Sequence, residues 1–222
     1  MIAVVDYGAG NVQSVVNALE AIGADAVLTA DGETIRSARG VIVPGVGAAR
    51  DTMRNLERGG LIAPVLDVMA AGTPYLGVCM GMQALMTFSE EHGGQRCLDV
   101  VPGVVRQLET DLAVPHMGWN AVNPTKFGGG HPLLDGIPSG AEFYFVHSFA
   151  CFPHDQAWVL AETEYGPTFP SIIGHGNIMS TQFHPEKSGA YGMQLLRNFI
   201  RIVQAGSVEK LVAERVGAPE CL

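Results

Sequence analysis

The sequence is poor in cysteine and in positive charge, and each shortage excludes a class of protein. Its four cysteines, Cys79, Cys97, Cys151 and Cys221, lack the close pairing of a metal site. We therefore expect free thiols in a reducing, cytoplasmic environment and no disulfide framework. Lysine and arginine number 13 against 22 aspartates and glutamates, so the formal net charge is −9. Nucleic-acid binding needs a concentrated basic surface, so DNA or RNA is not expected as a partner.

Long hydrophobic runs and targeting signals are also missing. No stretch approaches the roughly 20 apolar residues that a transmembrane helix needs. The N-terminal run Met1–Asp6 has no basic region and no small-residue cleavage site. We expect neither membrane association nor export. The 222 residues, 47% of them hydrophobic and without internal repeats, predict one sizeable domain with a full core.

Short apolar runs alternate with segments of helical periodicity. Residues Ile2–Val5, Val41–Val43 and Tyr75–Val78 are typical of strands, and Asn11–Ile22 and Leu61–Ala70 are typical of helices. Runs that are apolar at nearly every position predict parallel strands covered on both faces. The sequence thus predicts an α/β fold, a mostly parallel twisted sheet flanked by helices, whose site lies beyond the carboxyl ends of the strands.

The C-terminal half is organised differently. Residues 100–183 are rich in strand and turn signals, which indicates that some strands there are antiparallel. Apolar residues at helical spacing predict a last helix of the domain over Tyr191–Gln204. We place one domain at residues 1–204. Residues 205–222 would form an extension, partly helical near Val208–Ala213 and then frayed.

Cys79 lies in the run Gly77-Val78-Cys79-Met80-Gly81, between a predicted strand and a helix-like segment. This pattern predicts a nucleophile elbow, because glycines on both sides permit a sharp strand-to-helix turn that exposes the central side chain. A helix N-terminus favours the attacking thiolate form. A buried and inert core cysteine is the alternative, and it is the more common fate of a cysteine in an apolar run.

His184 and Glu186 are two residues apart in Ser180-Thr181-Gln182-Phe183-His184-Pro185-Glu186. In an extended chain their side chains share one face, so the carboxylate can orient the imidazole. His184 would then act as general base and acid for Cys79, and Glu186 would stabilise the imidazolium. The alternative is a histidine that caps a loop and a solvated glutamate.

Two glycine-containing loops follow predicted strands. Pro44-Gly45-Val46-Gly47 is interpreted as an oxyanion loop, in which a backbone N–H group, with one after Cys79, meets charge on a substrate oxygen. A βα turn without chemistry is the alternative, and it is the more common role of such residues in α/β folds. Asp6-Tyr7-Gly8-Ala9-Gly10-Asn11 lacks the third glycine of a dinucleotide-binding loop, so we expect a tight βα turn.

Taken together, these segments resemble the class I glutamine amidotransferases, whose triad is Cys, His and Glu in this order. Within that family the chain is similar to the glutaminase subunits of imidazole glycerol phosphate synthase, of the histidine pathway. The matching blocks run through nearly the whole chain: Asp6 to Asn11, Pro44 to Gly47, Pro115-His116-Met117-Gly118-Trp119-Asn120, Tyr144-Phe145-Val146-His147-Ser148 and Gly176 to Gly189.

The resemblance implies a hydrolysis of glutamine to glutamate and ammonia through a thioester on Cys79. It implies oxyanion and substrate contacts from Gly45, Val46, Gly47, Met80, Gln83, Glu91, His147 and Ser148. Gln83 lies one helical turn beyond Cys79. Glu91 would bind the ammonium group of glutamine, with Glu90 as a rival, and His147 with Ser148 would donate to its carboxylate. The resemblance also implies that Asn11 is the N-cap of the first helix. No cofactor or metal is implied.

A glutaminase domain of this length has no second site for an acceptor, so the ammonia must pass to another protein. The resemblance implies a (β/α)₈-barrel synthase subunit that receives it as the other half of a heterodimer. Candidate interface residues are Asn11, Trp119, Tyr144 and Lys187. A paralogue with another sugar acceptor, a stand-alone cysteine hydrolase and a flavodoxin-like binding module remain as alternatives.

Overall fold

The computed structural model describes residues 1–217 and contains the strands and helices that the apolar runs predicted. The strands are β1 (Ile2–Val5), β2 (Ala26–Thr29), β3 (Gly40–Val43), β4 (Tyr75–Val78), β5 (Met86–Ser89), β6 (Gln95–Arg96), β7 (Val101–Gln107), β8 (His116–Pro124), β9 (Ala141–His147), β10 (Phe149–Pro153), β11 (Val159–Glu164), β12 (Thr168–His175) and β13 (Ile178–Thr181). The α-helices are α1 (Val12–Ala21), α2 (Gly32–Ser37), α3 (Ala49–Arg58), α4 (Ile62–Ala70), α5 (Met80–Gln83), α6 (Gly189–Ala205) and α7 (Val208–Gly217). Short 3₁₀ turns lie at Glu91–Gly93, Pro132–Leu134, Gln156–Trp158 and Pro185–Lys187.

A mixed sheet of nine strands forms the centre of the molecule, in the order β2-β1-β3-β4-β13-β12-β11-β8-β9. The strands from β2 to β13 in this order are parallel, and those from β12 to β9 continue the sheet in antiparallel pairs. The predicted α/β fold with antiparallel strands in the C-terminal half is therefore confirmed. A second sheet of four strands, β10-β7-β5-β6, was not predicted.

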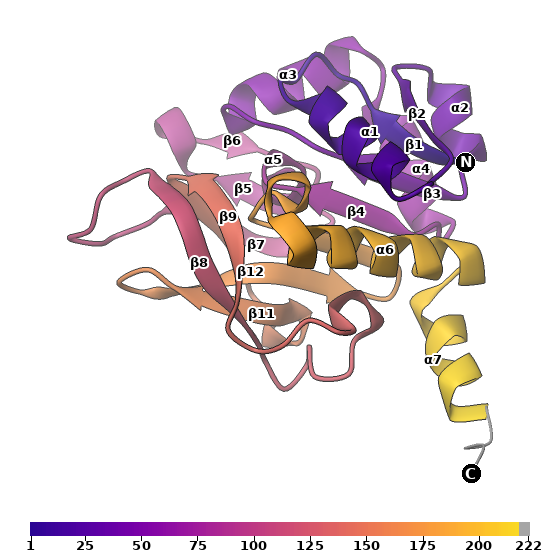
Figure 1. The fold of residues 1–222 in the computed structure, drawn as a ribbon. Helices are drawn as coiled ribbons and strands as arrows, with labels where there is room; N and C mark the ends of the chain where they lie inside the picture. Colours follow the sequence, from indigo (N-terminus) through magenta and orange to yellow (C-terminus); the bar gives the residue numbers. More distant parts are fainter. Residues whose placement is uncertain (218–222) are drawn as a thin grey trace.

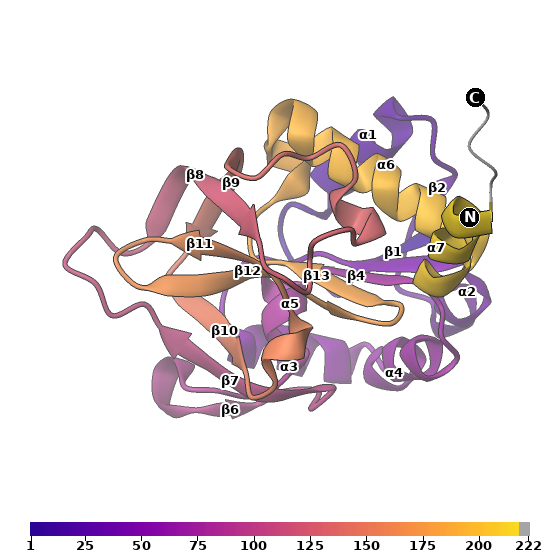
Figure 2. The ribbon, with the colours of Figure 1, turned by 90° about the horizontal axis from the view of Figure 1, so that it is seen from below.

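The parallel strands are buried on both faces, which explains their continuous apolar sequence. In β1, Ile2 and Val4 contribute to the core beneath α1 and α6, whereas Ala3 and Val5 contribute to the core beneath α2, α3 and α4. Figure 2 shows α1 and α6 on one side of the sheet and α3 and α4 on the other. Both helical layers depend on this alternation of side chains.

The last helix, α7, packs against the domain. Val208 and Leu211 are buried members of the core that contains α6, and the Asn177 side chain accepts a 2.9 Å hydrogen bond from the Val208 backbone N–H. Figure 1 shows α7 turning away from the end of α6. The helix predicted within the extension is present, and residues 218–222 of that extension lie outside the described residues.

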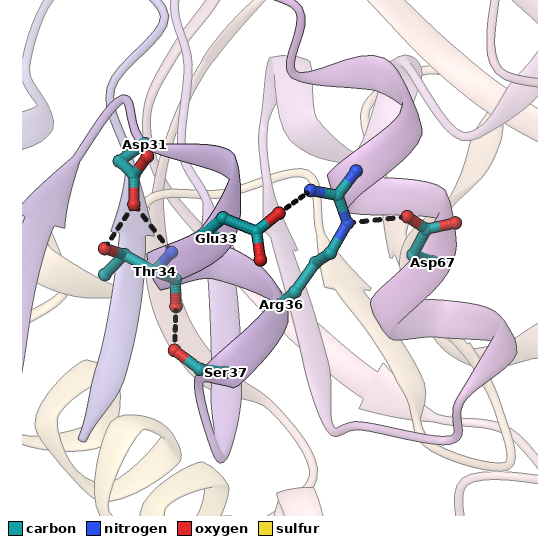
Figure 3. A network of polar contacts seen from close by, with 6 residues as sticks. All are labelled: Asp31, Glu33, Thr34, Arg36, Ser37 and Asp67. Atoms are coloured by element: carbon teal, nitrogen blue, oxygen red, sulfur yellow. Dashed lines mark hydrogen bonds and ion pairs between the residues drawn. The ribbon is translucent and has the colours of Figure 1, made fainter.

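A polar network on the surface joins α2 to α4 (Figure 3). The Asp31 carboxylate caps α2 by accepting from the backbone N–H and the hydroxyl of Thr34, at 2.8 and 2.6 Å, and these bonds lower the pKa of Asp31. Arg36 donates to Glu33 at 2.6 Å and to Asp67 of α4 at 2.8 Å. These ion pairs are exposed, so each of them adds little to stability.

Three adjacent parallel strands determine where chemistry can occur. Strand β4 pairs with β3 on one side and with β13 on the other. Parallel strands end at the same edge of a sheet, so the segments that follow β3, β4 and β13 meet there. Those segments contain Pro44–Gly47, Cys79 and His184, respectively.

Candidate active site

Cys79 occupies a strained turn between β4 and α5. Its φ of 54° and ψ of −102° are unusual for a residue with a side chain, as a nucleophile elbow requires. The neighbouring glycines serve close packing, because a Cβ atom at Gly81 would overlap the backbone oxygen of Val43 and one at Gly77 would lie 2.6 Å from that of Gly81. Cys79 itself therefore has the strained dihedral angles, and the two glycines provide the space that the turn needs.

The strand pairing brings His184 to Cys79. The Cys79 backbone N–H donates to the carbonyl of Thr181, the last residue of β13, at 2.8 Å. His184 follows three residues later and is held by its own backbone N–H, which donates to the Tyr144 carbonyl at 3.0 Å. His184 is 1% exposed, so its imidazole faces the interior of the site.

Glu186 contacts His184 through a turn. The His184 Nδ1 and Glu186 Oε1 atoms are 2.8 Å apart, and the Glu186 side chain is fully buried. Residues Pro185–Lys187 form a 3₁₀ turn, so the prediction that both side chains share a face of an extended segment is wrong. The turn, which begins at Pro185, brings the carboxylate back toward the imidazole instead.

The neighbours of His184 determine its charge. Burial by itself lowers the pKa of His184, but the sulfur of Cys79 and the carboxylate of Glu186 outweigh burial and raise the pKa to about 9. Among the described residues, His184 Nε2 and Glu186 Oε2 are buried without a hydrogen-bond partner. The imidazole is thus protonated at neutral pH, with Nε2 as the nitrogen that is free to transfer a proton.

Asn11 contacts the same carboxylate. It lies at the N-cap position of α1 with a φ of 69°, but its side chain makes no capping hydrogen bond. The Asn11 amide instead donates to Glu186 Oε1 at 2.7 Å. Asn11 is thus the N-cap residue of α1, as predicted, but its side chain bonds to the buried acid and not to the helix backbone.

Gln182 is a contact of Cys79 that the sequence did not reveal. Its Nε2 lies 3.7 Å from the Cys79 sulfur, and its Oε1 lies 3.5 Å from the Nε2 of Gln83. Gln182 is fully buried. The position two residues before His184 in an extended segment was the available signal, since it places both side chains on one face.

The loop after β3 presents a carbonyl group to the nucleophile turn. The Gly45 carbonyl accepts a 3.4 Å hydrogen bond from the backbone N–H of Met80. The Tyr7 side chain packs against Gly45, where a Cβ atom would overlap its hydroxyl. In this conformation the Met80 N–H, one of the two expected oxyanion donors, is occupied by a protein oxygen.

A pocket of about 450 Å³ opens beside Cys79. It is lined by Val46, Gly47, Cys79, Met80, Gln83, Glu91, His92, Pro115, Val146, His147, Ser148 and Phe149. Of the oxyanion and substrate residues named from the sequence, all line this pocket except Gly45, which contacts Met80 instead. The volume suits a small polar ligand.

Glu91 faces this pocket, whereas Glu90 pairs with Arg106 at 3.2 Å on the outside. One Glu91 carboxylate oxygen accepts from the backbone N–H of Ala49, the first residue of α3, at 2.7 Å. The other lies 3.8 Å from His92 Nε2. The structure thus places Glu91, and not its rival, where a ligand ammonium group could bind.

His147 lines the pocket, but its ring is engaged elsewhere. Its Nδ1 lies 2.9 Å from the carbonyl oxygen of Phe149, and its Nε2 lies 3.1 Å from His116 Nδ1. Burial lowers the pKa of His147 to about 3, so the ring is neutral. Both imidazole nitrogens therefore have partners within the protein, and the predicted contact of His147 with a ligand carboxylate stays a prediction.

The other residues named as interface candidates lie beside the site. Trp119 is 54% exposed, and its ring contacts Tyr144 edge to face at 6.2 Å between centroids. Tyr144 is half-buried and Lys187 is exposed. Together they form a surface next to the His184–Glu186 turn.

Residues 1–217 contain neither a metal centre nor a membrane-spanning helix. No group of three or more His, Cys, Asp and Glu side chains gathers there in a way that could hold a metal ion. In the same part of the chain, no helix combines the length and the apolar character that a membrane span requires.

Comparison with known proteins agrees with the fold. The family model of class-I glutamine amidotransferases matches residues 3–203. The imidazole glycerol phosphate synthase subunit HisH of Chloroflexus aurantiacus is 48% identical over 206 residues, covering 92% of this chain and 97% of its own. The subunit HisH of Herpetosiphon aurantiacus is 48% identical over 202 residues, covering 91% and 94%, respectively. A solved structure of a glutamine amidotransferase shares the fold at 19% identity, with a TM-score of 0.72 over 92% of this chain and 100% of the other.

Proposed function

Because the chain belongs to the class I glutamine amidotransferase family, we propose that its site hydrolyses glutamine for a (β/α)₈-barrel synthase subunit. The chain is the glutaminase subunit of imidazole glycerol phosphate synthase in histidine biosynthesis, as its 48% identity with HisH subunits indicates. We assign it to the cytoplasm, where its free cysteines, Cys79, Cys97 and Cys151 in the described residues, would persist. Residues 1–204 would form the catalytic domain.

One observation supports this function above the others. The nucleophile turn after β4 and the His184–Glu186 turn after β13 meet beside a pocket that also contains Gln83 and Glu91. The pocket can hold the amide of glutamine next to sulfur and its ammonium group next to Glu91.

The reaction proceeds in two halves. In the first, the Cys79 sulfur attacks the side-chain carbonyl carbon of glutamine. The protonated His184 donates its proton to the departing nitrogen, so ammonia is released and the glutamyl group remains on Cys79 as a thioester. In the second, neutral His184 accepts a proton from water, the water oxygen attacks the thioester carbon, and glutamate leaves with Cys79 restored. The His184 pKa of about 9 suits the proton donation that the first half requires.

The oxyanion of each tetrahedral intermediate needs donors that the present loop conformation withholds. The Gly45 carbonyl occupies the Met80 N–H at 3.4 Å. Rotation of the Gly45–Val46 peptide would release Met80 and turn the Val46 N–H toward the substrate. We propose that docking of the barrel subunit with its acceptor favours this rotation, so that ammonia is made only when it can be used.

The proposal is tested by measuring ammonia release from glutamine with wild type, Cys79→Ser and Cys97→Ser, each alone and mixed with a candidate barrel subunit and its acceptor. Cys79→Ser should lower the rate by about 10³-fold or more. Cys97→Ser is the control and should retain activity, since Cys97 does not line the pocket. The barrel subunit should raise the wild-type rate.

Two results would contradict it. Ammonia release that survives Cys79→Ser excludes this nucleophile. Equal wild-type rates with and without the barrel subunit exclude the coupling and favour a stand-alone cysteine hydrolase.

A further inference from the structure

Two buried histidines, His116 on β8 and His147 on β9, lie opposite each other in the strand pairing. They are 2% and 5% exposed, and His116 Nδ1 is 3.1 Å from His147 Nε2. The triad uses neither of them. A buried pair of titratable groups that the proposed mechanism leaves unused requires an explanation.

The hydrogen-bond partners at both ends determine the tautomer of each ring. At one end, the Phe149 carbonyl lies 2.9 Å from His147 Nδ1 and can only accept, so Nδ1 carries the proton of His147. At the other end, Asn120 Oδ1 accepts from the Ala121 backbone N–H at 2.8 Å, which turns the Asn120 amide nitrogen toward His116 Nε2 at 3.2 Å. His116 must therefore carry its proton on Nδ1 and donate to His147.

The tautomers assigned from the Phe149 contact and from the Asn120 contact are consistent with each other, and each residue of this series donates its hydrogen bond to the next. Asn120 donates to His116, His116 donates to His147, and His147 donates to Phe149. Burial lowers the pKa of His116 to about 4 and that of His147 to about 3, so both rings are neutral. Tyr165 and Phe145 stack on His116, with centroids at 3.9 and 4.8 Å, and hold its ring plane.

The chain of bonds ends at the glutamine pocket. The Phe149 carbonyl that accepts from His147 also accepts from Gln83 Nε2 at 3.2 Å. Gln83 in turn contacts Gln182, which reaches the Cys79 sulfur. Polar contacts therefore continue from β8 to the nucleophile through buried side chains.

We propose that His116 and Asn120 are positioning residues of the glutamine site, which fix the Phe149 carbonyl and, through it, the Gln83 amide. The inference rests on the proposed glutaminase function. It also explains the arrangement of Pro115-His116-Met117-Gly118-Trp119-Asn120. His116 and Asn120 share the inner face of β8, whereas Met117 and Trp119 are 61% and 54% exposed on the other face.

The test compares His116→Phe with His116→Asn in the complex with the barrel subunit. Phenylalanine keeps the stacked ring and removes both nitrogens, so His147 Nε2 loses its donor. The KM for glutamine should rise about tenfold or more, with kcat within about threefold. Asparagine can place an amide donor near the former Nδ1 position and should restore most of the KM. The rate of Cys79 alkylation by iodoacetamide should not change.

Tyr165→Phe is the matched control, because it keeps the stacking and removes only the hydroxyl that donates to the Ala113 carbonyl at 2.8 Å. It should leave the KM unchanged. If His116→Phe does not fold, Asn120→Asp takes its place. Its carboxylate cannot donate to His116 Nε2, so the KM should rise and imidazole ¹⁵N shifts should report a changed His116 tautomer.

The proposal is overturned if folded His116→Phe or Asn120→Asp keeps the wild-type KM. It is also overturned if wild-type ¹⁵N shifts place the proton of either histidine on Nε2, or if His116→Asn raises the KM for glutamine as much as His116→Phe does. A wild-type complex without glutaminase activity would instead contradict the proposed function and would leave the tautomers measurable.

Discussion

The buried carboxylate of Glu186 contributes to the charge of His184. A single oxygen of this group accepts from both His184 and Asn11, at 2.8 and 2.7 Å. The Cys79 sulfur and this carboxylate together raise the pKa of His184 to about 9 despite burial. Loss of the His184 proton above pH 9 removes the donor for the departing ammonia, so the glutaminase rate should fall there.

Glu186→Gln tests this contribution. The amide keeps an acceptor for His184 Nδ1 and removes one of the two groups that raise its pKa, so the pKa should fall from about 9 toward the ordinary value of about 6.5. The alkaline limb of kcat/KM against pH, measured in the complex, should therefore move down by about one unit or more. Glu142→Gln, at an exposed glutamate of β9, is the control. An alkaline limb that stays in place in Glu186→Gln would contradict the assignment.

Helix α5 is only four residues long, and its contact with β3 holds the nucleophile turn in place. The closest approach is at Gly81, where a side chain would overlap the Val43 carbonyl. Backbone atoms cannot yield as a flexible side chain can. The elbow therefore depends on glycine as a spacer between two elements, and Cys79 accepts the strained dihedral angles.

Gly81→Ala should separate α5 from β3. We expect a loss of about 3 kcal/mol of unfolding free energy, measured by urea denaturation, together with loss of glutaminase activity. Gly129→Ala is the matched control, because its nearest neighbour would be 3.7 Å from the new methyl group and its φ is not positive. A Gly81→Ala variant with wild-type stability would exclude the proposed contact.

At the scale of the whole molecule, an exposed apolar surface lies near the site. Met117 and Trp119 of β8 lie on it, next to Tyr144 and the exposed Lys187. A protein partner that docks here would contact the strand whose inner face holds His116 and Asn120.

Trp119→Ala should weaken binding of the barrel subunit about tenfold or more, since buried aromatic anchors dominate interface energy. Isothermal titration calorimetry measures this affinity. The thermal midpoint of the isolated chain should change little, because the side chain is 54% exposed. Phe127→Ala, at a residue 41% exposed in the turn after β8, is the control. Equal affinities of wild type and Trp119→Ala for the barrel subunit would show that Trp119 is not part of the interface.

The local sequence was sufficient wherever a property depends on neighbours in the chain. The apolar run of β4, the glycine spacing around Cys79 and the His-Pro-Glu segment indicated the nucleophile, its base and the acid. The parallel strands were predictable because burial on both faces leaves no polar positions. The family resemblance then indicated which glutamates and loops to place around glutamine.

The tertiary structure decided what depends on contacts between distant segments. It brought the Asn11 amide to the Glu186 carboxylate, 175 residues away in sequence, and the Gln182 amide to the Cys79 sulfur. It engaged both nitrogens of His147 and turned the Gly45 carbonyl toward Met80. A hydrogen bond depends on the position and direction of both partners, and the order of residues along the chain specifies neither until the sheet has formed.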